Sequence, residues 1–173
     1  VSPSMSSGSG GGDWRPVLRY FNSNSNTIVT LDSGSLSSYF QKELLSEKEI
    51  ILQVELYECD LSFLGGLGHV HKFVIVETTN WYYTVEKNDK GLSMQRSKKK
   101  SDVRENVDGH KRDKGEPSLK KVNKVSYGDS LQKLIQWIVR YEIHVKYDLI
   151  GDNCKDFAVR CYSVIMHSGD TSL

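Results

Sequence analysis

Apolar runs are short throughout the 173 residues, and none approaches the length of a membrane-spanning helix. The first dozen residues are mostly serine and glycine and lack the apolar centre of a signal peptide. Neither a membrane span nor a signal peptide is therefore expected. We expect residues 1–12 to form a flexible leader, followed by a single domain over 13–173 that is long enough to bury a core.

Cysteine is scarce as well. The three thiols, Cys59, Cys154 and Cys161, cannot all pair with one another, and the chain has no Asn-x-Ser/Thr acceptor for N-linked sugars. Both absences are typical of a reducing compartment, so the sequence favours a cytoplasmic protein over a disulfide-stabilised secreted one. No cofactor is expected.

Aromatic residues are absent between Lys87 and Lys124, a stretch with 13 basic and 6 acidic residues. Without aromatic side chains to stack on bases, dedicated nucleic-acid binding is not expected. The local positive charge could still contact an anionic partner, because the rest of the chain carries the compensating acidic residues. Few apolar residues and no periodicity are visible here, so the sequence predicts a largely disordered basic insertion at about 88–124.

Hydrophobic periodicity elsewhere predicts an α+β domain, with helices packed against a small antiparallel sheet. Strands are expected at 27–31, at 49–59 and, as a hairpin, at 71–77 and 81–87. Helices are expected at 35–46 and at 127–143, where an apolar stripe is capped by Asp129 or Ser130. A further helix is expected to begin near Cys154.

Cys154 stands at an unusual place for a cysteine, the expected first turn of that last helix. Asp152 and Asn153 are capping residue types, and the apolar residues that follow recur at spacings of three and four. Backbone N–H groups and the dipole at a helix start stabilise a thiolate. Cys59 and Cys161 fall on packed faces, where burial disfavours ionisation. Cys154 is therefore the candidate nucleophile, with a buried structural cysteine as the alternative.

A nucleophilic cysteine needs a base within hydrogen-bond reach, and five histidines are available. His110 and His167 lie in the basic stretch and the tail, and His144 lies in a loop. His69 and His71 open the most apolar strand and share one face of it, because they are two residues apart. His71 directly precedes the apolar run and is the expected base, with His69 as its alternative.

The segment 147–158 reads Tyr-x-Leu-x-x-x-Asn-Cys-x-x-Phe-Ala, with Tyr147, Leu149 and Cys154 at its marked positions. It resembles the cysteine motif of circularly permuted papain-like proteins: the lecithin:retinol acyltransferase-like family, the NlpC/P60 peptidases and the PPPDE isopeptidases. In these families the histidine precedes the cysteine and begins a strand, as His71 does before Lys-Phe-Val-Ile-Val. The resemblance covers roughly 49–166. Acyltransferase-like members usually have Glu-His where this chain has Lys155 and Asp156.

The resemblance implies a permuted papain-like fold in which Cys154 is the nucleophile and His71 the general base. The backbone N–H of Cys154 would then contribute to an oxyanion hole. Thr84 is the candidate for orienting His71, with Tyr83 or Glu86 as alternatives, although PPPDE-like members are described as using a Cys/His dyad alone.

The function expected from this is a cysteine-dependent hydrolase of peptide, isopeptide or amide bonds that forms an acyl-enzyme intermediate. Two alternatives stay open. One is an acyltransferase or phospholipase-like thiol enzyme acting on lipid esters. The other is a non-catalytic interaction module on the same fold, with the basic stretch as its contact surface.

Metal binding is a rival use of the same side chains. His69, His71 and Cys154 could supply three ligands to zinc. No Cys-x-x-Cys pair and no carboxylate at metal-site spacing accompany them in the sequence, so no metal is expected.

Overall fold

The computed structural model describes residues 14–43, 48–60, 70–112, 115–125, 130–148 and 153–167. The expected leader at 1–12 lies outside the described residues, as do His69, Asp129, Leu149 and Asp152. Among the described residues, no helix is both long enough and apolar enough to cross a bilayer.

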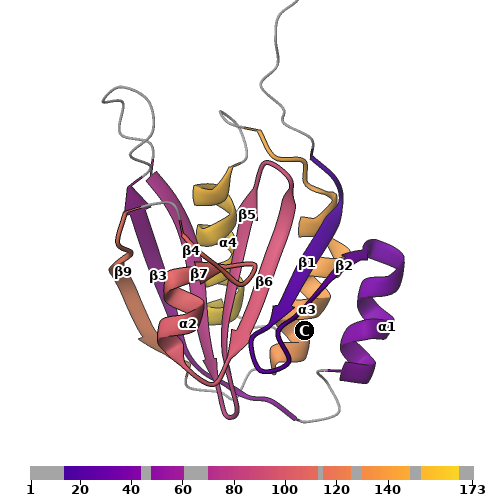
Figure 1. Ribbon diagram of the computed structural model, residues 1–173, viewed down its shortest axis with the longest axis horizontal. Coiled ribbons are helices and arrows are strands. Elements are labelled where there is room, and N and C mark those ends of the chain that lie inside the picture. The colour runs from indigo at the N-terminus through magenta and orange to yellow at the C-terminus, as the bar shows by residue number, and fades with distance from the viewer. Residues whose placement is uncertain are drawn as a thin grey trace, which may run out of the picture.

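A seven-stranded sheet forms the centre of the fold, in the order β2-β1-β6-β5-β4-β3-β9 (Figure 1). All neighbouring strands are antiparallel except β1 and β6, which are parallel. The strands are β1 (Val17–Asn22), β2 (Thr27–Asp32), β3 (Ile51–Asp60), β4 (Val70–Thr78), β5 (Tyr82–Asn88), β6 (Gly91–Ser97) and β9 (Ser118–Lys124). A small separate hairpin pairs β7 (Asn106–Val107) with β8 (His110–Lys111).

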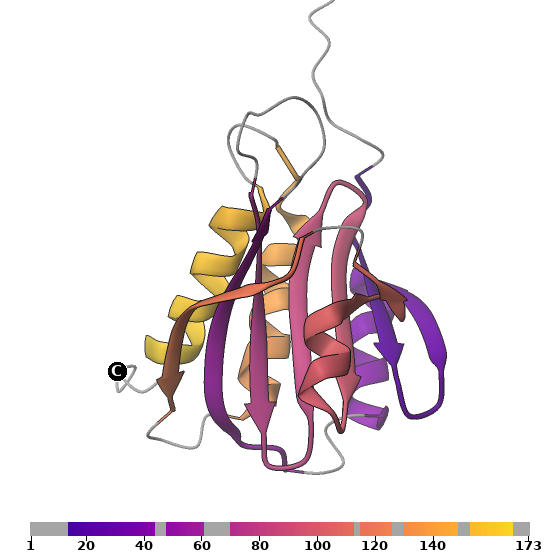
Figure 2. The same ribbon diagram turned by 60° about the vertical axis from the view of Figure 1, so that its left-hand side comes forward.

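The helices lie on both faces of the sheet, so the expected α+β class is confirmed (Figure 2). They are α1 (Ser33–Glu43), α2 (Lys100–Glu105), α3 (Leu131–Arg140) and α4 (Cys154–His167), with a 3-10 turn, η1, at Glu142–His144. Figures 1 and 2 place α1, α3 and α4 on one face, which we call the helix face. The short helix α2 lies on the opposite face, which we call the α2 face.

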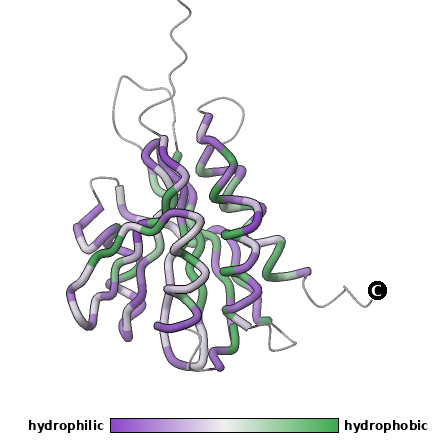
Figure 3. The backbone as a smooth tube through the Cα atoms, turned by 90° about the vertical axis from the view of Figure 1, so that its right-hand side faces the viewer, coloured by the Kyte–Doolittle hydropathy of each residue, from purple (hydrophilic) through white to green (hydrophobic). Residues whose placement is uncertain are grey.

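Each face of the sheet buries its own hydrophobic cluster, because successive side chains along a strand point to opposite sides. On β4, Val74 and Val76 join the large cluster beneath α1, α3 and α4. Phe73 and Ile75 join a smaller cluster beneath α2. Figure 3 shows the resulting alternation of hydrophobic and hydrophilic residues along strands and helices. The sheet is therefore buried on both sides around β4 and β5.

The elements expected from periodicity at 27–31, 49–59, 71–77 and 81–87 are present as β2, β3, β4 and β5. The amphipathic helix α3 buries Leu131, Leu134, Ile135 and Ile138, as its spacing predicted. The sequence spacing also places Tyr141 on this apolar stripe, but the helix ends at Arg140, and Tyr141 is 61% exposed.

The prediction of a disordered basic insertion at about 88–124 is wrong for the part of it that the structure describes. Segment 91–97 forms β6, which pairs with both β5 and β1 in the interior of the sheet. Leu92 and Met94 point into the large cluster, while Ser93 and Gln95 are buried on the α2 face. Their polar atoms are hydrogen-bonded to the Arg19 guanidinium and to a carbonyl of α2, respectively, which removes the cost of burying them.

Gly109 offers a test of order in this segment. It follows Asp108 in the β7–β8 turn, and both have positive φ, 81° and 50°, which is typical of an Asp-Gly hairpin. A Cβ at Gly109 would lie 2.6 Å from the Phe21 ring. Gly109→Ala should therefore lower the free energy of unfolding by about 2 kcal/mol in denaturant titrations, from backbone strain and this contact.

Gly115→Ala is the matched control, because its Cβ would meet nothing closer than 3.6 Å and its φ is not in the left-handed region. It should change stability little. If Gly109→Ala unfolds with the same free energy as the wild type, the hairpin is not packed against β1 and the disordered interpretation returns.

Candidate functional site

Cys154 is the first residue of α4, as the sequence predicted. Asn153 is the N-cap, because its carbonyl accepts the first hydrogen bond of the helix, from the Phe157 N–H at 3.1 Å. The Asn153 Oδ1 accepts a hydrogen bond from the Lys155 N–H at 2.9 Å, and the Asp156 carboxylate accepts one from the Asn153 N–H at 3.2 Å. This reciprocal pair is a capping box, which satisfies N–H groups that a helix start leaves without intrahelical acceptors. It fixes where α4 begins and so fixes the position of the thiol.

The Cys154 thiol is directed at the beginning of β4. Its Sγ lies 3.9 Å from the carbonyl oxygen of Val70, the residue whose peptide bond leads into His71. The side chain of Tyr147 is close as well: burial, then the negative potential of Cys154 and Asp89, raise the pKa of Tyr147 to about 12. Cys154 is 6% exposed, so the thiol sits just below the surface.

Cys161 lies two turns further along α4 in a different environment. It is fully buried in the large cluster, and that burial, together with the nearby Glu142 carboxylate, raises the pKa of its thiol far above the ordinary value. A thiol in this setting stays protonated and unreactive at neutral pH. Cys59 is also buried, in the smaller cluster on the α2 face.

His71, the expected base, is buried on the α2 face, where a carboxylate holds its ring. Its Nε2 lies 2.7 Å from Glu86 Oε2, and the ring stacks near Phe73 with centroids 6.2 Å apart. Glu86 in turn accepts two hydrogen bonds from the Arg112 guanidinium, at 2.8 and 2.9 Å. All three side chains are nearly excluded from solvent, with exposures of 2%, 2% and 6% for His71, Glu86 and Arg112.

The residue that orients His71 is therefore Glu86 and not Thr84, the first candidate from the sequence. Thr84 points to the same face but stands opposite Ile75, too far along the strand. Tyr83 points to the helix face, where its hydroxyl donates a hydrogen bond to Glu49 at 2.9 Å. The alternation of side chains along β5 separates Tyr83 from Thr84 and Glu86, which share one face. Choosing Glu86 over Thr84 required the pairing register between β5 and β4.

Glu86 is ionised at neutral pH. Burial alone would raise the pKa of this carboxyl, but the Arg112 guanidinium and the hydrogen bond with His71 outweigh burial and hold it well below its usual range. Because the pKa is lower in the folded protein than in the unfolded chain, the ionised carboxylate stabilises the fold at neutral pH. That contribution is lost as the pH falls through the folded-state pKa.

Cys154 and His71 approach β4 from opposite faces, since α4 packs on the helix face and the imidazole lies on the α2 face. At this end of the sheet, β4 and β5 diverge. Backbone pairing between the two strands runs from Glu77 opposite Tyr82 to Val74 opposite Val85. Beyond that point, β4 continues with β3 and β5 continues with β6. Figure 1 shows α4 behind the space between β4 and β5. The side chains of His71 and Glu86 connect the two strands here.

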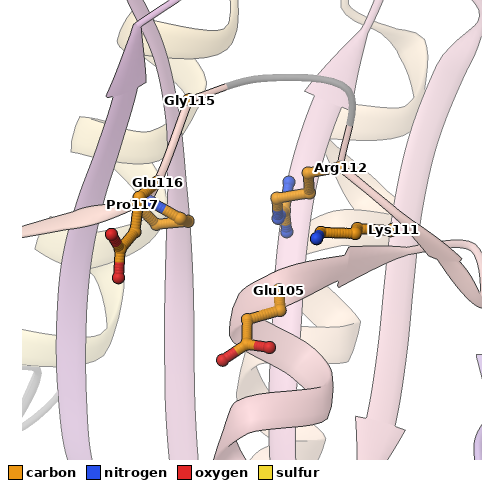
Figure 4. A pocket seen from close by; sticks show the side chains of 6 residues that line it. All are labelled: Glu105, Lys111, Arg112, Gly115, Glu116 and Pro117. Atoms are coloured by element: carbon orange, nitrogen blue, oxygen red, sulfur yellow. The ribbon is translucent and has the colours of Figure 1, made fainter.

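A cavity of about 410 Å³ lies on the α2 face and is lined in part by Arg112 (Figure 4). Arg112 and Lys111 line one side of it, Glu116 and Pro117 the other, and Glu105 rises from the end of α2. The lining residues include both acidic and basic side chains. Arg112 connects the cavity to the Glu86–His71 pair, because it lines the cavity and donates hydrogen bonds to Glu86.

A second buried ion network lies on the helix face and was not anticipated from the sequence. Lys87 is fully buried, with its Nζ 4.0 Å from a Glu142 carboxylate oxygen and 5.2 Å from the Trp14 ring centre. Glu142 also accepts two hydrogen bonds from Arg160 of α4, at 2.7 and 2.9 Å. These contacts tie α4 to η1 and to the end of β5, and so help fix the helix that carries Cys154.

No group of three or more histidine, cysteine, aspartate or glutamate side chains within the described part of the chain could hold a metal ion. His69, which the zinc alternative requires, lies outside the described residues.

The chain matches no protein-family model, and no similar curated protein or solved structure is found. The resemblance to permuted papain-like proteins, carried by the segment around Cys154 and by His71, therefore stays a prediction.

The capping box predicts that Asn153→Ala weakens the start of α4. Loss of the side-chain acceptor should lower the free energy of unfolding by about 1 kcal/mol in denaturant titrations. Ser130→Ala is a suitable control, because Ser130 caps α3 without a side-chain hydrogen bond to the backbone. The control should cost clearly less. Equal losses in the two variants would contradict the assignment of Asn153 as the residue that positions Cys154.

Proposed function

We propose that the protein is a cysteine-dependent hydrolase of peptide, isopeptide or amide bonds, with a permuted papain-like arrangement of Cys154, His71 and Glu86. One observation carries the proposal. A thiol at a capped helix start lies beside the strand residue that precedes a buried histidine, and a carboxylate binds Nε2 of that histidine. Nucleophile, base and orienting group are the three parts that covalent catalysis by a thiol requires.

The division of roles follows from the ring contact. Glu86 engages Nε2, so proton exchange with the thiol runs through Nδ1 of His71. In the first step, the Cys154 sulfur forms a bond to the substrate carbonyl carbon, and His71 delivers the proton to the departing amine. In the second, His71 removes a proton from water, whose oxygen attacks the thioester. The carboxylic acid leaves and the Cys154 thiol is restored.

The helix start supports charge development in both steps. The tetrahedral intermediate carries a negative oxygen, and backbone N–H groups in the first turn of a helix are donors suited to it. The N–H of Cys154 is the proposed donor, because it belongs to the first residue of α4. Transfer of the acyl group to an acceptor other than water would use the same intermediate, so acyl transfer involving lipid esters remains the related alternative. A cytoplasmic setting is part of the proposal.

A non-catalytic interaction module is the second candidate, and one observation favours it. Cys154 is only 6% exposed, and the His71 ring is 2% exposed. A substrate would have to displace part of the surrounding chain to reach the sulfur. The two candidates differ in the reactivity of one thiol, which can be measured directly.

We expect Cys154 to react selectively. Treatment with iodoacetamide near pH 6, followed by peptide mass mapping, should label Cys154 well before Cys59 and Cys161, because only Cys154 lies at a helix start and it is the least buried of the three. With p-nitrophenyl acetate, a burst of one nitrophenol per protein molecule should leave an acetyl group on Cys154.

Cys154→Ser should remove the burst and the adduct while keeping the fold, whereas Cys161→Ser should retain both. Slow and uniform labelling of the three cysteines in the wild type would reject the enzyme and favour the interaction module.

A second expected outcome concerns the base. His71→Gln should abolish the selective reaction of Cys154 at low pH, since the imidazolium that stabilises the thiolate is lost. Thr84→Val alters a buried neighbour on the same face without touching the ring, and it should spare the reaction. Unchanged low-pH labelling in His71→Gln, with normal unfolding, would assign the base to another residue, of which His69 is the first to test.

A further inference from the structure

Arg112 binds the carboxylate behind the proposed base and is itself held at three other places. Its two terminal nitrogens bind both oxygens of Glu86, and its Nε donates to the carbonyl of Arg104 at 2.9 Å. The guanidinium lies 3.9 Å from the centre of the Phe73 ring. The backbone N–H of Arg112 donates a hydrogen bond to the backbone carbonyl of Glu105 at 2.9 Å. The side chain is 6% exposed. It is thus fixed against the end of α2 and against β4.

The charge of Glu86 creates a problem for a histidine that has to act as a base. A lone carboxylate beside a buried imidazole stabilises the imidazolium strongly, because the dielectric screening inside the protein is weak. An imidazole that is held protonated cannot remove a proton from water in the second step. The Glu86–Arg112 pair carries no net charge, so it can orient the ring while exerting only a dipolar field on it.

We infer that Arg112 is a positioning residue that acts on His71 through Glu86: it neutralises the carboxylate, so that the imidazole is oriented and can still lose its proton near neutral pH. The inference rests on the proposed function in that it takes His71 as the base. It adds Arg112, from the segment expected to be disordered, to the proposed site of Cys154, His71 and Glu86. It also explains how the Glu86 carboxylate can orient His71 without keeping the imidazole protonated.

Other groups face His71 from each element packed around it. Cys59 stands opposite it on β3, Glu86 lies on β5, and Cys154 of α4 lies beyond the Val70 carbonyl. Arg112 follows β8. Of these, only Glu86 and Arg112 bear permanent charges at neutral pH. Lys111 and Glu116 lie on the outer rim of the cavity, where solvent screens their charges.

Three variants separate a role in proton affinity from a role in folding. In Arg112→Gln, Glu86 is left with its full charge, and the titration midpoint of His71 should rise by about one pH unit or more. Arg112→Lys keeps the charge and should stay near the wild-type midpoint. The double variant Arg112→Gln/Glu86→Gln replaces the ion pair with two neutral amides, so its midpoint should return toward the wild type.

The midpoints are measured on the full chain by NMR with labelled histidine, with the His71 resonances assigned by their absence in His71→Gln. The hydrolysis of the acetyl thioester formed with p-nitrophenyl acetate is followed against pH in parallel. Its rising limb should move with the His71 midpoint in each variant. Lys111→Gln, which removes a neighbouring but solvent-exposed positive charge, is the control and should leave both midpoints unchanged.

The outcomes are distinguishable. If Arg112→Gln unfolds more easily but titrates as the wild type does, Arg112 is a structural ion-pair partner only, and the inference is overturned. If Arg112→Gln does not fold, the double variant decides: a midpoint displaced from the wild type by about a pH unit or more overturns the inference. If the wild type forms no acetyl thioester at all, the proposed function fails. The NMR midpoints still decide whether Arg112 controls the protonation of His71.

Discussion

The structure around the divergence of β4 and β5 depends on the hydrogen bonds of one buried carboxylate, that of Glu86. It joins His71 of β4, its own strand β5 and Arg112 from the segment after β8, and all three side chains are nearly excluded from solvent. The backbone pairing of β4 and β5 has already ended at this level, so side chains hold the two strands in place of ladder hydrogen bonds. Removing one partner of such a buried group leaves an uncompensated charge, which typically costs about 3–5 kcal/mol.

Two adjacent residues of β5 carry buried charges on opposite faces of the sheet, and each charge has a partner of opposite sign. Glu86 is neutralised on the α2 face by Arg112, and Lys87 is compensated on the helix face by Glu142, which Arg160 also binds. Because strand side chains alternate, one short segment anchors both the histidine and the helix that carries Cys154. The divergence of β4 and β5 is therefore a fixed feature with charged contacts on either side.

The two faces of the sheet carry different functional groups at this end. The helix face contributes a thiol at a capped helix start, and the α2 face contributes an imidazole with an ionised partner and a cavity lined by charged residues. A thiol enzyme needs these parts within one hydrogen-bond length during the reaction. The side chains of Cys154 and His71 are both buried. Whether a substrate can reach the Cys154 sulfur is therefore what separates the proposed enzyme from the interaction module.

Local periodicity in the sequence was enough to predict β2 to β5, the stripe of α3 and the place of Cys154 at a helix start, because each depends on residues within a few positions. The same pattern favoured His71 as the base, which stays a prediction. The composition of 88–124 led to the wrong prediction of disorder. The alternation of Leu92-Ser-Met-Gln95 is typical of a strand and Asp108-Gly109 is typical of a hairpin turn, but the many charged residues around them obscure both signals. Burial of Ser93 and Gln95 needed partners from distant segments. Only the tertiary structure could select Glu86 over Thr84, bring in Arg112 and set the thiol and imidazole on opposite faces, since these follow from strand register and side-chain direction across segments far apart in the chain.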